Sequence, residues 1–183
     1  MNVMAAAREE AQTLSGLSLK LGDGLGLEDL LSLLAVRVRH LVPHDAMAVN
    51  VLRNRVLIPE FVSGENLRMF SSLRIPVGEG LSGWVAQNTK PILNGNPSVE
   101  PGYLNDPRRY STLRSALAVP LQGASSVVAV LALYRGAQDA FTREDLNVLQ
   151  ALTSQLGSTI ERALQNPSAG TNKAAASAAY AGD

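Results

Sequence analysis

The chain of 183 residues contains no cysteine. Without a thiol it forms no disulfide, offers no thiolate to a metal ion, supplies no cysteine nucleophile and holds no chromophore through a thioether bond. The absence of cysteine also fits a reducing compartment. We therefore expect a cytoplasmic, soluble protein.

An excess of charge of one sign is also missing. Lysine and arginine total 16, aspartate and glutamate total 16, and the isoelectric point is about 6.7. With this balance the chain has no excess of positive charge that would favour binding to nucleic acid or to an anionic membrane. The longest apolar run, Val127 to Tyr134, is far shorter than the roughly 18 residues that span a bilayer. The first seven residues lack the basic flank and apolar core of a secretory signal. We expect neither nucleic acid nor membrane as a partner.

Catalytic and metal-binding motifs are absent as well. The two histidines, His40 and His44, are four residues apart, but Pro43 lies between them and no third ligand is near. Helix-end and loop positions explain them better than a metal site does. The sequence has no G-x-S-x-G elbow, Walker loop, H-E-x-x-H motif or paired-carboxylate pattern. With no nucleophile, metal cluster or acid/base pair, an enzyme is the least supported hypothesis, and we predict none.

The most informative stretch runs from Ile75 to Asn96. Three glycines with the spacing G-x-G-x-x-G stand at Gly78, Gly80 and Gly83. A dinucleotide-binding fingerprint needs a core strand before this motif and a full crossover helix after it. Here Pro76 interrupts the preceding run and Asn88 cuts the apolar pattern that follows. We favour a tight turn that passes close to a packed layer. The side chains expected to face inward are Leu81, Trp84 and Val85.

Apolar residues at spacings of three and four predict helices at both ends of the chain. A weak heptad pattern runs from Met4 to Leu21 and ends at the glycine-rich residues 22–26. A stronger helix spans Leu27 to Leu41, before Pro43. Thr142 is the expected N-cap of a final helix, with Asp145 at its third position, and one continuous apolar stripe extends to Ala163. Phe141 and Leu146 fit a hydrophobic staple across this N-terminus.

Runs rich in β-branched residues predict two hairpins. The first pairs Ala46–Leu52 with Val56–Val62, and the second pairs Ala116–Leu121 with Val127–Tyr134. The last run is apolar on both alternating faces, which predicts a central strand covered on both sides. Residues 91–93 fit a short strand, and residues 65–73 a short helix or irregular segment.

A long segment without apolar periodicity extends from Asn94 to Arg114. Loops of this length in compact domains are usually lids or binding loops. Its arginines and tyrosines fit a clamp for an anionic or planar ligand. A solvated loop explains them equally well. The residues concerned are Tyr103, Arg108, Arg109, Tyr110 and Arg114.

Four ordered blocks resemble the hallmarks of GAF domains over about residues 27–164. They are I-P-V-G-E-G-L-S-G-W-V-A-Q-N-T-K-P-I, then N-D-P-R-R-Y before R-S-A-L-A-V-P-L, then V-V-A-V-L-A-L-Y, and F-T-R-E-D-L-N-V-L-Q-A-L-T-S-Q. The resemblance implies an α+β fold with an antiparallel sheet of about five or six strands. It places the terminal helices on one face. A short helix and the long loop would form a small-molecule pocket on the other.

The resemblance further implies a sensory module, usually a homodimer through its N- and C-terminal helices. Such a module regulates an output domain such as a diguanylate cyclase, histidine kinase or transcriptional activator. The expected division is a signalling helix with a glycine-rich turn in residues 1–26, a sensory domain in 27–165 and a flexible tail or linker in 166–183. The ligand and any cofactor are unidentified. The expected ligand-binding residues are Phe61, Trp84, Tyr103, Asp106, Arg109, Tyr110, Ser115 and Leu131.

Departures from the known subfamilies reduce the number of ligand classes that fit this sequence. Members that bind cyclic nucleotides carry an Asn-Lys pair ahead of a Phe and an Asp-Glu. Here Phe141 and Asp145 keep that spacing, but Tyr134-Arg135 replaces the pair and Leu146 follows the aspartate. Methionine sulfoxide reduction and bilin attachment rely on cysteines, and the histidines lie on the wrong side of the first strand to ligate haem. The alternative is a ligand-free dimerisation and interaction module whose pocket is filled by its own side chains.

Overall fold

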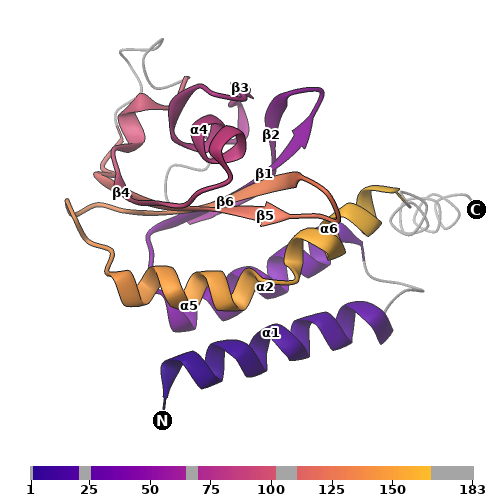
Figure 1. Ribbon diagram of the computed structural model, residues 1–183. Helices are drawn as coiled ribbons and strands as arrows, with labels where there is room; N and C mark the ends of the chain where they lie inside the picture. Colours follow the sequence, from indigo (N-terminus) through magenta and orange to yellow (C-terminus); the bar gives the residue numbers. More distant parts are fainter. Residues whose placement is uncertain (1, 21–25, 65–69, 102–110, 166–183) are drawn as a thin grey trace, which may run out of the picture.

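A computed structural model describes residues 2–20, 26–64, 70–101 and 111–165. A curled antiparallel sheet of six strands, in the order β3-β2-β1-β6-β5-β4, divides the molecule into two layers (Figure 1). This is the α+β architecture expected from the sequence. The tail after residue 165 and the glycine-rich residues 21–25 lie outside the described residues, as does most of the segment 65–73.

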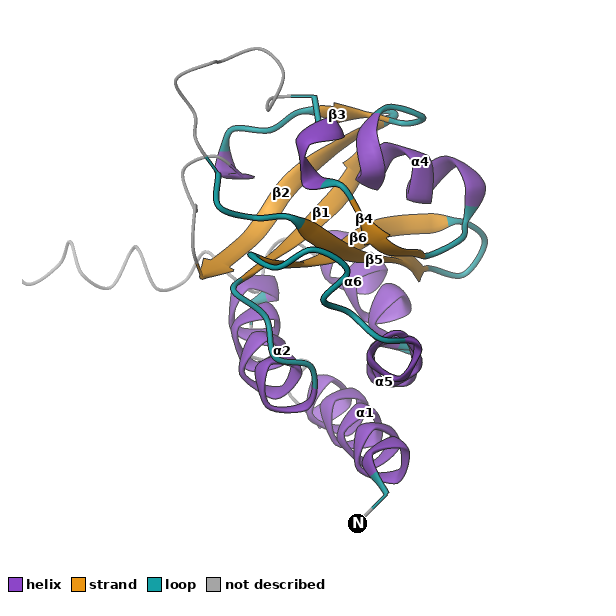
Figure 2. Cartoon of the chain, turned by 90° about the vertical axis from the view of Figure 1, so that its left-hand side faces the viewer, coloured by secondary structure: helices purple, strands orange, loops and turns teal. Residues whose placement is uncertain are grey.

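Four helices cover one face of the sheet. They are α1 (Val3–Lys20), α2 (Leu27–Leu41), α5 (Arg143–Thr153) and α6 (Leu156–Gln165). The helix α1 lies outermost and packs mainly on α5 (Figures 1 and 2). Among the residues of α1 whose burial the structure describes, Ala7 and Ala11 are buried. None of the described helices has a stretch long and apolar enough to cross a membrane.

The helix α4 (Gly80–Asn88) lies on the opposite face and packs on β5 and β6. The strands are β1 (Ala46–Arg53), β2 (Val56–Gly64), β3 (Ile75–Pro76), β4 (Ile92–Gly95), β5 (Ser115–Gln122) and β6 (Val127–Arg135). The strand β6 lies between β1 and β5 and is buried along most of its length. Its predicted central position is confirmed.

Alternation along the strands produces two separate cores. In β1 the side chains of Met47 and Val49 join the core under the helices, whereas Ala46 and Ala48 join the core under α4. Both predicted hairpins form. Asn54 and Arg55 turn the first one with φ of +50° and +63°, because two consecutive left-handed residues match the twist of the flanking strands.

The long loop expected from Asn94 onward is wrong in its first part. Asn94 and Gly95 extend β4, and Pro97–Val99 form a 3₁₀ turn. The Asn96 side chain accepts a hydrogen bond from the Ser98 amide, and a proline follows it directly, so a short local motif replaces apolar periodicity here.

The final helix is two helices, so the prediction of one continuous helix is also wrong. The chain turns between Thr153 and Leu156, and α6 leaves the direction of α5 toward the end of β5 (Figure 1). At this point two side-chain hydroxyls donate hydrogen bonds to backbone carbonyls of the preceding turn. The Thr153 hydroxyl donates to the Leu149 carbonyl at 2.8 Å, and the Ser154 hydroxyl donates to the Ala151 carbonyl at 3.0 Å. Such bonds compete with the helical ladder and favour a bend. The apolar stripe alone does not reveal it.

Candidate functional site

The glycine-rich turn positions the start of α4. The Gly78 amide donates to the Gly83 carbonyl at 2.8 Å, and a Cβ added at Gly83 would lie 2.3 Å from the Pro76 carbonyl oxygen. At Gly80 φ is +61°, a conformation that other residues rarely adopt. The prediction of a tight turn against a packed layer is confirmed.

Only part of the expected inward face of α4 is buried. Leu81 and Val85 face the sheet, whereas Trp84 is 40% exposed. Residues 81 and 85 are four apart and share one helical face, while residue 84 lies at its rim. The expectation that Trp84 faces inward with Leu81 and Val85 is therefore wrong.

A carboxylate lies buried at the N-terminus of α4. Glu100 is fully buried, and its Oε1 accepts hydrogen bonds from the Ser82 amide at 2.9 Å and the Ser82 hydroxyl at 2.6 Å. Its Oε2 has no hydrogen-bond partner in the described part of the chain. A Cβ at Gly80 would lie 2.3 Å from this oxygen, so glycine is what allows the carboxylate to approach. Glu100 thus caps α4 from a distant loop.

Burial raises the pKa of Glu100, against the hydrogen bonds from Ser82 and Leu81, which lower it. Sequence analysis did not identify Glu100 as a functional residue. It follows a proline-rich segment and stands 18 positions from its partner, so no local pattern joins the two. The candidate site therefore contains a buried acidic group that sequence analysis missed.

The layer between α4 and the sheet is apolar apart from a few groups. The rings of Phe70 and Tyr134 stack with centroids 4.5 Å apart. Leu113, Leu81 and Val85 belong to the same buried layer. The polar exceptions among the buried described residues of this side are Asn50, Ser82 and Glu100.

Two expected site residues lie on the other face. Phe61 pairs with Val49 and Leu131 also pairs with Val49, and Leu131 is buried in the core under the helices, where Phe61 packs from its rim. The expectation that they line a space together with Trp84 is wrong. For Phe61 the cause is the irregular register after Pro59, which leaves Glu60 without a partner and shifts the face that follows.

The other expected site residues are scattered or outside the described residues. Ser115 is buried at the start of β5, and its hydroxyl donates to the Ala137 carbonyl at 2.8 Å. Arg114 is exposed and donates to the carbonyls of Ser111 and Leu113. The structure does not describe Tyr103, Asp106, Arg108, Arg109 and Tyr110, and their role in ligand binding stays a prediction.

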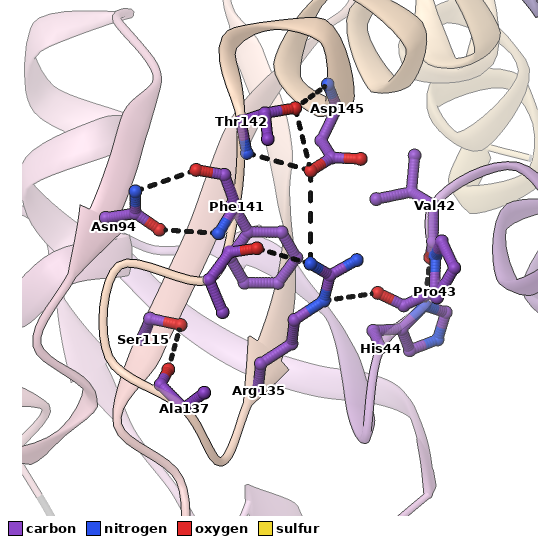
Figure 3. Close-up of polar contacts among 11 residues, drawn as sticks. Val42, Pro43, His44, Asn94, Ser115, Arg135, Ala137, Phe141, Thr142 and Asp145 are labelled. Carbon is purple, nitrogen blue, oxygen red and sulfur yellow. Dashed lines mark hydrogen bonds and ion pairs between the residues drawn. The ribbon is translucent and has the colours of Figure 1, made fainter.

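A polar cluster joins β4 to the N-terminus of α5 (Figure 3). Asn94 accepts a hydrogen bond from the Phe141 amide at 2.9 Å and donates one to the Phe141 carbonyl at 2.8 Å. The next residue, Thr142, caps α5: its hydroxyl accepts from the Asp145 amide at 3.1 Å, and Asp145 accepts from the Thr142 amide at 2.8 Å. The predicted capping box is confirmed.

Arg135 connects this cluster with the loop before β1. Its guanidinium lies 4.5 Å from the centre of the Phe141 ring and donates to the carbonyls of Pro43 and Ala140. Asp145 is 4.0 Å away. A single side chain at the end of β6 thus connects the loop before β1 with the first turn of α5 (Figure 3).

The histidines do not form a metal site. His44 is buried, and because a carbonyl can only accept, its Nδ1 donates to the Val42 carbonyl at 2.8 Å. Burial lowers the pKa of His44, although this hydrogen bond raises it. No group of acidic or histidine side chains in the described residues has the arrangement of a metal site.

Comparison with known proteins identifies the family. The GAF domain family matches residues 24–161, about three quarters of the chain. The chain belongs to the GAF domain family. A comparison of this GAF domain with curated proteins found no match.

Solved structures share the fold. The GAF domain of a phosphoenolpyruvate-protein phosphotransferase from Coxiella burnetii is 21% identical with a TM-score of 0.68, and the alignment covers 88% of this chain and 98% of that one. Free methionine-R-sulfoxide reductase from Neisseria meningitidis, in complex with its substrate, is 18% identical with a TM-score of 0.67, covering 90% and 94%.

The GAF domain of a two-component sensor histidine kinase from Bacillus halodurans is 22% identical with a TM-score of 0.61, covering 79% of this chain and 99% of that one. At such identities the likeness shows the fold alone. The GAF fold therefore occurs in signalling proteins and in at least one type of enzyme.

Proposed function

We propose that this GAF domain is a sensory and regulatory module without catalytic activity. A small molecule binds on the α4 side of the sheet, and the change passes to the terminal helices, which form a homodimer. Those helices regulate an output domain of the diguanylate cyclase, histidine kinase or transcriptional activator type, in the same chain or in a partner, in the cytoplasm.

The observation that carries this proposal is the path of the segment from β4 to Glu100. At one end Asn94 holds the backbone of Phe141, directly before α5. Six residues later Glu100 holds the first turn of α4 through Ser82. A displacement of α4 is therefore transmitted to the start of α5 across the edge of the sheet. The coupling requires a ligand that binds the two arrangements with different affinity.

The relatives support the proposal in part. One structural neighbour belongs to a sensor histidine kinase, and another binds a substrate. The reductase chemistry of the latter does not extend to this chain, because the sulfoxide-reducing members of the family rely on cysteines and this chain has none.

A thermal-shift screen of the intact chain against metabolites and nucleotides tests the sensory function. A ligand present at 100 times its dissociation constant should stabilise the fold by about 2.7 kcal/mol. A broad library that leaves the melting temperature unchanged would contradict ligand sensing.

One observation favours a second candidate, a ligand-free dimerisation module. The described side chains on the α4 side already form a buried apolar layer, with Phe70, Leu81 and Tyr134 at 1%, 6% and 1% exposure. Such a module would dimerise through the same helices but show no ligand-dependent stability. The thermal-shift screen separates the two functions, because a ligand raises the melting temperature of the sensory module alone.

A further inference from the structure

A short segment, residues 42–45, connects α2 with β1 and contains the buried side chain of His44. The Nδ1 of this histidine donates to the carbonyl of Val42, the residue at which α2 ends, at 2.8 Å. At the other end of the segment, the Asp45 amide donates to the Tyr134 carbonyl at 2.9 Å, directly before β1 begins. The imidazole therefore lies within the connection between the helical layer and the sheet.

Two guanidinium groups approach the same segment. Arg39, in the last turn of α2, donates to the His44 carbonyl at 3.5 Å. Arg135, at the end of β6, donates to the Pro43 carbonyl at 2.6 Å. Among the described charged residues near His44, these two arginines oppose a positive charge on its ring, and Asp45 favours one less strongly. The surroundings of the imidazole thus have an excess of positive charge.

A neutral imidazole suits this arrangement better than a charged one. In the neutral ring with its hydrogen on Nδ1, the other nitrogen is an uncharged acceptor. A proton on that nitrogen places a third positive charge near the two guanidinium groups, in a region with little water, where repulsion is stronger than in bulk solvent. Burial and the two arginines therefore lower the pKa of His44, although the hydrogen bond to Val42 and the charge of Asp45 raise it.

The side chain of Arg135 extends from this segment to the start of α5 (Figure 3). Besides its bond to the Pro43 carbonyl, the guanidinium donates to the carbonyl that precedes Phe141 and lies 4.5 Å from the centre of the Phe141 ring. The Asp145 carboxylate, in the first turn of α5, is 4.0 Å away. A force that displaces Arg135 from residues 42–45 therefore also acts on the N-terminus of α5.

We propose that His44 is an acid-sensitive switch of the helical layer. Protonation of its ring repels Arg135, weakens the bond between this arginine and the Pro43 carbonyl, and loosens the N-terminus of α5. The switch acts in the unliganded protein. It therefore goes beyond the proposed ligand sensing and does not depend on it.

The direction of the pH dependence follows from the lowered pKa of His44. The folded protein disfavours the proton, so on acidification the unfolded chain binds it first. Stability attributable to His44 is complete above its ordinary pKa of 6.5 and is lost as the pH falls through the folded-state pKa. For one proton this linkage changes the folding equilibrium by at most about tenfold per pH unit.

An NMR titration of the unliganded intact chain from about pH 7.5 to about pH 5 tests the switch. The amides of Phe141, Asp145 and Leu146 should shift with the same midpoint as the His44 ring. Their protection against hydrogen exchange, corrected for the intrinsic effect of pH, should fall at least threefold. Amides at the start of α5 that do not follow the titration of the His44 ring would overturn the proposal.

Two histidine variants provide the matched comparison. His44→Asn retains an amide donor for the Val42 carbonyl and removes the titrating ring, so the start of α5 should no longer respond to pH in this range. His40→Asn is the control, because His40 is exposed in the last turn of α2, and it should keep the wild-type response. An unchanged response in His44→Asn would overturn the proposal. The wild-type titration needs no variant and decides the question even where His44→Asn folds poorly.

Discussion

At the scale of single residues, the buried carboxyl of Glu100 dominates the chemistry of the α4 layer. Its pKa is raised by burial, so the folded protein holds a proton there at pH values where the unfolded chain has released it. Stability attributable to this group is therefore present below its ordinary pKa of 4.5 and is lost as the pH rises through the folded-state pKa.

We predict that Glu100→Gln removes this dependence. The variant keeps an oxygen for the two Ser82 hydrogen bonds but carries no ionisable group, so its stability should not fall in the range above pH 4.5 as that of the wild type does. Urea unfolding at several pH values measures the difference. The exposed residue Glu79 offers the control, because Glu79→Gln should keep the wild-type pH profile. Parallel profiles for wild type and Glu100→Gln would contradict the burial argument.

Two glycines give a matched pair of opposite predictions. Gly83→Ala should destabilise the fold by about 1–3 kcal/mol, because its Cβ would lie 2.3 Å from the Pro76 carbonyl oxygen. Gly16→Ala should stabilise it by about 0.5–1 kcal/mol, because this glycine is inside α1 with nothing within 4 Å of an added Cβ. Denaturant unfolding checks both. A neutral Gly83→Ala would show that the turn does not need its close backbone approach.

Sequence analysis predicted the glycines better than the side chains around them. The role of the turn follows from residue type and spacing, which are local properties. The face of the sheet on which Leu131 lies does not follow from local properties. Because β6 is apolar on both faces, the alternation of its residues does not indicate which core each side chain joins. Phe61 was misplaced by a register irregularity, and Glu100 was missed because its role depends on burial by distant segments.

At the scale of elements, the N-terminus of α5 is held by β4 at the edge of the sheet. Asn94 has φ of +57°, a left-handed conformation that asparagine tolerates, and its side chain bonds Phe141 twice. The elements themselves were largely predictable, since caps and apolar periodicity are local. The bend between α5 and α6 and the extension of β4 were not predictable. Hydroxyl side chains that compete for helical carbonyls, and the pairing of a strand with its neighbour, both depend on the surrounding structure.

We predict that Asn94→Gly destabilises the fold by about 1–3 kcal/mol, the combined effect of two lost hydrogen bonds. Asn94→Ala should be worse by up to about 1–2 kcal/mol, because alanine adds the strain of a left-handed backbone. Comparison of the two variants by urea unfolding separates bonding from conformation. Equal stability of Asn94→Gly and wild type would show that the contact with Phe141 does not hold α5.

At the scale of the whole molecule, the helical layer is the proposed dimer interface. We predict that the intact chain sediments as a dimer and that a chain lacking residues 1–26 and 166–183 shifts toward monomer, because it loses α1. A chain lacking only residues 166–183 should remain a dimer and serves as the control. Circular dichroism of each chain confirms folding. Monomers in every case would count against dimerisation through the terminal helices.

The central claim is that events on the α4 side reach α5 through the segment from β4 to Glu100. The most direct test is amide hydrogen exchange of the intact chain with and without the library compound that raises its melting temperature most. We predict slower exchange in the first turn of α5, residues 143–146, in the wild type, and loss of that response in Asn94→Gly while α4 remains protected. Protection confined to the α4 layer in the wild type, with α5 unchanged, would contradict the account.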